Sequence, residues 1–380
     1  MGGSYRSRWC VLGVLVGVGL GEPTAAAGSY GYIDTSGTMV ISPQFYSASG
    51  FKHGLAPVRN DARRYGYVDP TGRLAVDFTL AKAERLSSPK VAFAKFPGES
   101  SYVLITRSGR RVGTRTFARR LFFSEGLAAF EEGERCGYLN ERGETVIEAV
   151  YFGCRAFQHG LARVGKGERY GFVGPMGTVE IPFSFQEAEA YREQDGAVVA
   201  RVKQGGKSGL IDVAGAFVMP PVYGTVGVYG DGLFPAKLTG GRWGYIDDAN
   251  QVVVPGTYTW ASTCHHERCA VENKGQHGFI DPSGAVVIPL IYDSVSNFDG
   301  PYARVTRQGS DSFIGVDGQP FTTEDVDWLG IAADGRVPYR DRRTGRYGYL
   351  SEDGTVAIAA TYCRVDPFSE GLAAVKVCTD

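Results

Sequence analysis

Hydrophobic and polar residues alternate along most of this chain in short runs bounded by turn residues. One run reads Gly-Phe-Ile-Asp-Pro-Ser-Gly-Ala-Val-Val-Ile-Pro from residue 278. Alternation that favours aromatic and β-branched residues is typical of strands with two different faces. The Asp-Pro-Ser-Gly segment predicts a tight turn between two such strands. The pattern therefore predicts an all-β protein built from antiparallel hairpins.

The same run returns ten times. If position 0 is the residue six before the turn glycine, the copies begin at residues 31, 66, 103, 137, 171, 209, 244, 278, 312 and 348. A period of roughly 35 residues indicates a repeat array. Position +2 is a branched aliphatic residue in all ten copies. The turn glycines, which accept the positive φ that closes a hairpin, are Gly37, Gly72, Gly109, Gly143, Gly177, Gly215, Gly284, Gly318 and Gly354, with Asn250 in the seventh copy.

Each copy predicts three strands. The first opens with Gly-Tyr, and the second follows the turn and is expected to end at a proline near position +11, as in Val286 to Pro289. A stretch with a tyrosine and a phenylalanine comes next, and the third strand opens with Gly-Leu-Ala near position +23, as at residues 54–56 and 160–162. We therefore expect each unit to be a small antiparallel meander.

We expect about ten such meanders to form an open, twisted, solenoid-like array, because ten units exceed the four to eight blades usual for a propeller. The alternative is a closed, propeller-like ring. The chain begins on a Gly-Tyr strand without a Gly-Leu-Ala partner and ends on residues 371–377, a Gly-Leu-Ala strand without a following Gly-Tyr strand. Pairing these two ends would hide both strand edges.

The first 27 residues have the composition of a secretory signal peptide. Arg6 and Arg8 precede an apolar run from residue 10 to 20, and Ala25 to Ala27 provide a small-residue cleavage site. The apolar run is too short for a membrane anchor. We therefore predict a repeat domain over residues 28–380, no transmembrane segment after cleavage, and a secreted or periplasmic location.

Cysteine spacing agrees with an exported protein. Six of the seven cysteines fall after the predicted signal as three local pairs, Cys136 with Cys154, Cys264 with Cys269 and Cys363 with Cys378. We predict three disulfides, which persist in oxidising compartments; the alternative is six free buried thiols. Residues 264–269 also contain two histidines and could hold zinc, but an oxidising compartment favours the disulfide. No metal is predicted.

The sequence offers little chemistry. Acid, base or nucleophile must converge on one point in an enzyme, whereas the recurring acids here, Asp34, Asp69, Asp212, Asp247 and Asp281, are explained by their turns. Gly206-Lys207-Ser208 resembles the end of a phosphate loop, but the first glycine of that motif falls on Arg201. The net charge of −1 gives no indication of nucleic-acid binding. We predict no catalytic residue and no cofactor.

Two features suggest binding surfaces. The third copy contains six arginines whose guanidinium groups could form bidentate hydrogen bonds with carboxylates or phosphates. They are Arg107, Arg110, Arg111, Arg115, Arg119 and Arg120. The alternative is a solvated face balanced by Glu125, Glu131, Glu132 and Glu134. The second feature is an aromatic row at position −1, which suits sugar stacking if it faces water, although the alternation favours burial; it consists of Tyr30, Tyr65, Tyr102, Tyr170, Trp243 and Tyr347.

The complete repeat resembles the bacterial WG repeats, which are named for a Trp-Gly pair that is present here as Trp243-Gly244. Its consensus is aromatic-Gly-Tyr-Ile-Asp, a turn, Gly, Val-Ile-Pro, Tyr, Phe and Gly-Leu-Ala-Val. The resemblance runs from about residue 30 to 378 and is weakest where Val103 and Ser312 replace the first glycine. It implies a β-repeat architecture and an interaction role without catalytic residues. We therefore expect an exported, non-enzymatic binding or scaffold protein for a protein or a cell-envelope polymer. The alternative is a carbohydrate or small-ligand binder that uses the aromatic row.

Overall fold

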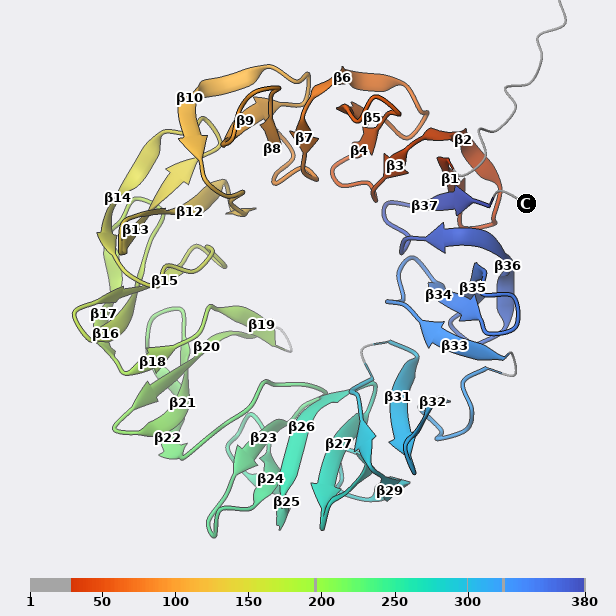
Figure 1. The fold of residues 1–380 in the computed structure, drawn as a ribbon. Helices are drawn as coiled ribbons and strands as arrows, with labels where there is room; N and C mark the ends of the chain where they lie inside the picture. The colour runs from red at the N-terminus through yellow and green to blue at the C-terminus, as the bar shows by residue number, and fades with distance from the viewer. Residues whose placement is uncertain (1–28, 195–196, 299, 323–324, 379–380) are drawn as a thin grey trace, which may run out of the picture.

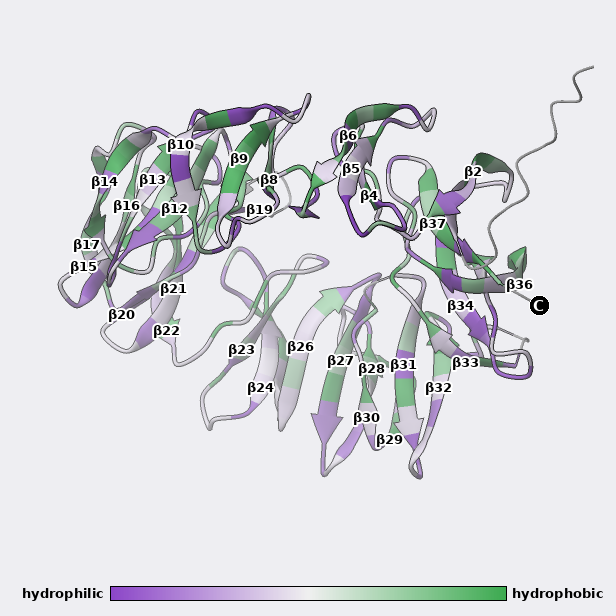
Figure 2. Ribbon diagram, turned by 45° about the horizontal axis from the view of Figure 1, so that its top comes forward, coloured by the Kyte–Doolittle hydropathy of each residue, from purple (hydrophilic) through white to green (hydrophobic). Residues whose placement is uncertain are grey.

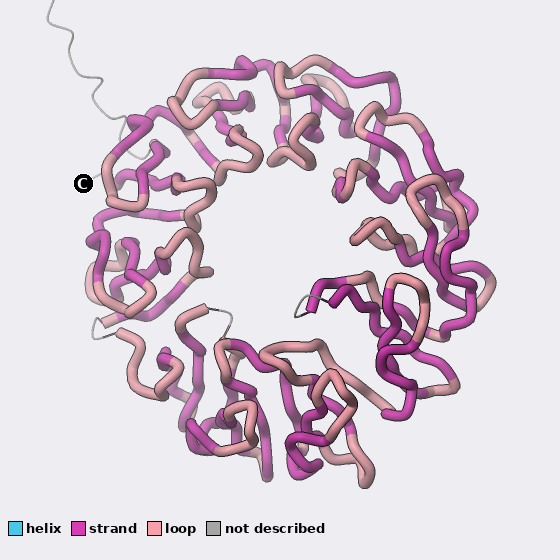
Figure 3. The backbone as a smooth tube through the Cα atoms, turned by 180° about the vertical axis from the view of Figure 1, so that it is seen from behind, coloured by secondary structure: helices cyan, strands magenta, loops and turns pink. Residues whose placement is uncertain are grey.

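The computed structural model describes residues 29–194, 197–298, 300–322 and 325–378, so the predicted signal peptide at residues 1–27 lies outside the described residues. Over the described ranges the chain forms strands and turns without a helix (Figure 3). Accordingly, no helix in these ranges is long and apolar enough to span a bilayer. The strands form small antiparallel sheets, and the all-β prediction is confirmed.

Four of the sheets have four strands each, hydrogen-bonded in chain order. They are β3 (Ser47–Ala48), β4 (Ala56–Arg59), β5 (Tyr65–Val68) and β6 (Leu74–Leu80); β7 (Lys82–Ala83), β8 (Val91–Lys95), β9 (Tyr102–Thr106) and β10 (Arg111–Phe117); β11 (Phe123–Ser124), β12 (Leu127–Glu132), β13 (Arg135–Asn140) and β14 (Thr145–Tyr151); and β26 (Trp260–His265), β27 (Arg268–Asn273), β28 (Gln276–Ile280) and β29 (Val286–Tyr292).

The remaining sheets vary this plan. Three have three strands: β15 (Ala162–Lys166), β16 (Arg169–Val173) and β17 (Val179–Phe185); β23 (Phe234–Lys237), β24 (Trp243–Ile246) and β25 (Val252–Tyr258); and β30 (Ser294–Val295), β31 (Tyr302–Arg307) and β32 (Ser310–Gly315). One contains β18 (Glu187–Ala188), β19 (Arg192–Gln194), β20 (Ala197–Gln204), β21 (Lys207–Asp212) and β22 (Phe217–Tyr223). The largest contains β33 (Val326–Leu329), β34 (Arg336–Asp341), β35 (Tyr347–Ser351), β36 (Val356–Val365), β37 (Leu372–Val377), β1 (Tyr30–Asp34) and β2 (Met39–Phe45).

Two details of the predicted meander are wrong. The four-stranded modules have an additional strand, of two residues in β3, β7 and β11 and of six in β26, which pairs with the strand that follows it. A strand of two residues shows no alternation in the sequence. The prolines near position +11 also do not end the second strand, since Pro182 and Pro289 lie inside β17 and β29. These are edge strands, in which a missing N–H group is tolerated.

The chain closes into a ring (Figure 1). Strand β1 pairs antiparallel with β37, which places Tyr32 opposite Ala374. Strand β36 links neighbouring modules, because its first part pairs with β35 and its last part pairs with β37. The expected open array is therefore wrong, and the ring is the arrangement that is formed. Closure pairs the two end strands that an open array would leave exposed.

The glycine at position 0 is needed because two strands cross very closely. A Cβ atom at Gly31 or Gly66 would lie 2.5 Å from the carbonyl oxygen of Ile41 or Val76 in the next strand. The register between the two strands shifts at this crossing. Only a residue without a side chain allows such an approach. The crossing buries the aliphatic residue at position +10, and Ile41 then packs against the turn glycine Gly72 of the following module.

The residue at position +1, aromatic in eight of the ten copies, packs into the core of its module. Figure 2 shows the underlying alternation of hydrophobic and hydrophilic residues along strands such as β31. Five tyrosines at this position are buried, and each hydroxyl donates to a backbone carbonyl 17 residues later; they are Tyr32, Tyr67, Tyr138, Tyr245 and Tyr349. Burial raises the pKa of each of these hydroxyls. They therefore remain protonated donors at physiological pH.

Replacing Gly66 with alanine is predicted to lower the free energy of unfolding by about 1–3 kcal/mol, the usual cost of forcing a methyl group into a filled space. Gly224 is the matched control, because a Cβ atom there meets no atom within 4 Å and the residue has no positive φ. Thermal or urea unfolding of G66A and G224A would measure the difference. Equal stability of the two variants would contradict the close crossing.

The Cys363–Cys378 disulfide joins β36 to the end of β37 in the closing sheet, across a sequence separation of 15. Replacing both cysteines with alanine should cost about 3 kcal/mol, the loop-closure entropy that the bond removes from the unfolded chain. Hydrogen exchange should then show faster opening of β1 and β37 than of β16. Uniform exchange in all three strands would indicate that closure does not depend on this bond.

Candidate functional site

A cleft of about 880 Å³ lies where the module of β11–β14 meets the module of β15–β17. Five arginines line it: Arg119, Arg120, Arg135, Arg155 and Arg163. Glu131, Glu134, Phe122, Tyr170 and the Cys136–Cys154 disulfide complete the walls. Arg119 and Arg120 follow β10, whereas Arg135 begins β13 and the other two lie on and just before β15.

The positive charges of this cleft exceed the carboxylates that pair with them. Arg119 forms an ion pair with Glu131, and Arg120 forms one with Glu84 at 2.8 Å. Arg135 and Arg155 are exposed, and neither forms an ion pair with any residue that the structure describes. The cleft therefore carries a net positive charge.

Arg163 is the most buried of the five, with 9% of its surface exposed. Its Nη1 donates to the carbonyl oxygen of Ala188 at 3.1 Å and its Nη2 to that of Gly153 at 2.5 Å. The guanidinium lies 4.5 Å from the ring centroid of Tyr170. Its Nε is buried and has no hydrogen-bond partner. Burial, followed by the neighbouring Arg155 charge, lowers the pKa of Arg163, but an arginine stays charged in a protein.

The six arginines singled out in the third copy do not form one surface. Only Arg119 and Arg120 reach the cleft. Arg107 donates to the carbonyl oxygen of His53 at 2.5 Å. Arg111 pairs with Glu99, and Arg115 pairs with Glu132 at 3.0 Å. Arg110 lies exposed on the turn before β10. Four of the six thus form ion pairs with carboxylates. Glu131 and Glu132 were expected among the balancing residues, whereas Glu84 and Glu99 were not.

Sequence reasoning missed Arg135, at the end of the third copy, and Arg155 and Arg163, which belong to the fourth copy. One signal was present in the sequence. The residue after Gly-Leu-Ala is Pro57, Ala129 or Ala374 in three copies, whereas it is Arg163 in the fourth. A large charged residue at a position that is small in the other three Gly-Leu-Ala copies marks a departure from them, and such departures concentrate at functional sites.

The family model described as "WG containing repeat" matches residues 30–63, 137–170, 170–207, 243–276, 278–309 and 347–377. The chain belongs to the WG-repeat family. The matches leave out the copies at 66, 103, 209 and 312. Val103 and Ser312 replace the first glycine in two of these four. No curated protein matches this WG-repeat chain.

Several solved structures resemble it at low identity. A eukaryotic initiation factor is 10% identical with a TM-score of 0.45, and the match covers 87% of this chain and 95% of that one. BamB from Moraxella catarrhalis is 10% identical with a TM-score of 0.36 and coverages of 93% and 99%. Hsv2p from Kluyveromyces lactis is 9% identical with a TM-score of 0.34 and coverages of 72% and 94%. All three likenesses are distant.

The aromatic row at position −1 of the WG repeats is largely covered. Tyr102 is buried, and the other five rings are half-buried. Cationic side chains lie over several of the rings: Arg59 is 5.2 Å from the centroid of Tyr65, and Lys95 is 4.6 Å from that of Tyr102. The row therefore offers little free ring face to a sugar.

The structure joins the three predicted cysteine pairs as disulfides. Cys264 and Cys269 are fully buried in β26 and β27, so their sulfurs are not available as zinc-binding thiolates. No group of three or more His, Cys, Asp or Glu residues that could hold a metal ion occurs in the described part of the chain. The turn aspartates serve their hairpins: Asp34 Oδ1 accepts from the N–H groups of Ser36 at 2.9 Å and Thr38 at 3.0 Å.

The contacts of Arg115 predict a structural role. Its guanidinium pairs with Glu132, donates to Thr145 Oγ1 at 2.9 Å and lies 4.2 Å from the centroid of Phe130. Arg115→Ala should therefore lower the free energy of unfolding by about 1–2 kcal/mol through lost packing and cation–π contact. Arg110→Ala, from a fully solvated position, should leave stability unchanged. Chemical unfolding of both variants would test this, and a neutral R115A would contradict it.

Proposed function

We propose that this WG-repeat protein is an exported, non-enzymatic binding protein whose ring presents the arginine-lined cleft to an anionic polymer of the bacterial envelope. One observation carries the proposal. Five guanidinium groups line the cleft between two modules, and among the described residues only Arg119 and Arg120 of the five form ion pairs with carboxylates. Arginine forks suit phosphate and carboxylate groups, so an outside anion would compensate the remaining charge.

The shape of the cleft favours a polymer over a compact protein surface. Arg119 and Arg120 lie on the segment after β10, and Arg135 and Arg155 come from β13 and the loop before β15. A chain with charges at intervals can contact these groups together, which raises its effective affinity. Three disulfides and a closed ring suit an exposed, oxidising location. The predicted signal at residues 1–27 agrees with that location.

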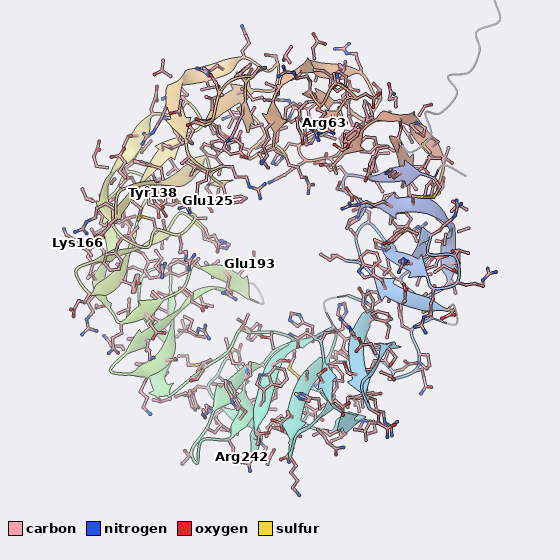
Figure 4. The ribbon with its side chains drawn as sticks, viewed as in Figure 1. Arg63, Glu125, Tyr138, Lys166, Glu193 and Arg242 are labelled. Atoms are coloured by element: carbon pink, nitrogen blue, oxygen red, sulfur yellow. A yellow bond between two sulfur atoms is a disulfide. The ribbon has the colours of Figure 1, made fainter. Side chains whose placement is uncertain are left out.

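The test compares two triple variants with the same change in net charge. One replaces Arg119, Arg135 and Arg155 with serine. The control replaces Arg73, Arg242 and Arg343, which are exposed and outside the cleft. Figure 4 shows Arg242 at the bottom of the ring, away from Tyr138 at the left, whose module forms one wall of the cleft. Binding to polyphosphate, polygalacturonate and neutral dextran would be measured at two salt concentrations.

We expect the cleft variant to bind the anionic polymers at least tenfold more weakly, a loss of about 1.4 kcal/mol. The control should bind like the unaltered protein. Binding should weaken as salt rises, because exposed charges are screened, and dextran should not bind. Equal losses in the two variants would show that net charge and not the cleft determines binding. If the protein captured an acidic protein and neither anionic polymer, the proposed polymer ligand would be wrong and the partner would be a protein.

A further inference from the structure

Three arginines occupy the same place in three different modules. Arg163 lies opposite Phe172, Arg201 opposite Leu210 and Arg304 opposite Phe313, and each partner is the residue at position +1 of the following repeat. Six other modules have proline or alanine in this place: Pro57, Ala129, Pro235, Ala270, Pro338 and Ala374. The module of β7–β10 has Phe93 in this place, opposite Leu104. Three modules therefore place a guanidinium where six place a small side chain.

Two of these arginines are neutralised by the protein itself. Arg201 forms an ion pair with Glu189, and Arg304 forms one with Asp311. Arg163 is bound by two backbone carbonyls and by the ring of Tyr170. It forms no ion pair with a carboxylate among the described residues, and Glu189, which pairs with Arg201, attracts it only from beyond ion-pair distance. A buried charge without a counter-charge is costly.

One residue accounts for the difference between the modules of Arg163 and Arg201. The N–H of Glu189 donates to the carbonyl oxygen of Arg201 at 2.9 Å, and the N–H of Arg155 donates to that of Arg163 at 3.0 Å. Arg155 thus stands in its module where Glu189 stands in the next one. An ion pair in one module is replaced by two like charges in the other.

The cavities beside Arg163 and Arg201 also differ in size. The cavity beside Arg201 has a volume of about 140 Å³, and Glu187 and Glu189 balance Arg201 and Lys203 in its lining. The cleft that contains Arg155 and Arg163 has a volume of about 880 Å³. The module in which no carboxylate forms an ion pair with the buried arginine is therefore the one with room for an external group.

We propose that Arg155 and Arg163 form a subsite for one oxyanion, a phosphate or carboxylate group of the bound partner, in the place that Glu189 takes beside Arg201. The proposal rests on the proposed function and names the chemical group that the cleft recognises. Tyr170 and the carbonyls of Gly153 and Ala188 fix the orientation of Arg163 before the anion arrives, which lowers the entropy cost of binding. The exposed Arg155 supplies a second guanidinium fork.

The first experiment uses the full mature chain, titrated with inorganic phosphate or acetate against chloride at equal ionic strength. A bound anion stabilises the folded state, so the thermal midpoint should rise in phosphate or acetate and not in chloride. The anion with the larger effect distinguishes a phosphate from a carboxylate group. Arg155→Glu should reproduce the ion pair of Glu189, raise the midpoint in chloride and weaken the response to the oxyanion at least tenfold. An undiminished response in R155E would overturn the subsite.

The reciprocal variant tests the same residue in the next module. Glu189→Arg should leave Arg201 without its carboxylate and create a second subsite, so that calorimetric titration finds two phosphate or acetate groups per chain where the unaltered protein binds one. Glu189→Gln removes the same charge with a smaller change of shape and should also gain an anion-dependent rise of the midpoint. A single bound anion in both variants would overturn the equivalence on which the subsite rests.

The experiments distinguish failure of the proposed oxyanion subsite from failure of the proposed polymer binding. If R155E loses the oxyanion response but still captures polyphosphate or polygalacturonate as well as the unaltered chain, the subsite stands and the polymer does not bind there. If the unaltered chain captures a polymer but neither phosphate nor acetate stabilises it, the subsite is overturned and the polymer function stands. Loss of both the oxyanion response and polymer capture in R155E supports the two together.

Discussion

The close crossing of two strands over the glycine at position 0 is the constraint on which the rest of this ring depends. Because Gly31 has no side chain, β2 can approach the first strand at a distance that a Cβ atom would block. This approach sends the aliphatic residue at position +10 toward the next module, where Ile41 meets the turn glycine Gly72. Each module is thus completed by its neighbour, as expected for repeat proteins, and the last contact in the series, Ile358 against Gly37, joins the end of the chain to its beginning.

The copy at residue 103, one of the two that lack this glycine, shows what the close crossing controls. With Val103 at position 0, the second strand pairs in another register, Thr116 lies opposite Val103, and position +10 is Gly113. Gly143 of the following module then meets Leu104 in place of the usual residue from the second strand. This second strand, β10, is followed by the segment with Arg119 and Arg120, which forms one wall of the cleft. The candidate site therefore lies where the packing rule of the repeat is relaxed.

The regular part of this structure could be predicted from the sequence because it recurs. The turn aspartates, the buried tyrosines and the three cysteine pairs each have a local cause that a single repeat reveals. The two-residue strands left no pattern to detect. The sequence left an open array and a closed ring as alternatives. The pairing of β1 with β37 depends on the small rotation that each module adds, and a single repeat does not reveal this rotation. The cleft could not be predicted, since its arginines come from two copies and only the fold brings Arg119 close to Arg135.

Arg163 and Arg201 show how one scaffold can use the same place in two ways. The backbone around them is equivalent: each guanidinium donates to a carbonyl of the following module, Ala188 or Val226. What differs is the charge of a single neighbour, Glu189 or Arg155, at a position where the backbone contact is the same. In one module the protein supplies the counter-charge and the contact serves stability alone. In the other the proposed oxyanion would supply the counter-charge from outside, so that binding and stability would be linked. A repeat array allows this division because neighbouring modules can hold the fold while one of them departs from the pattern.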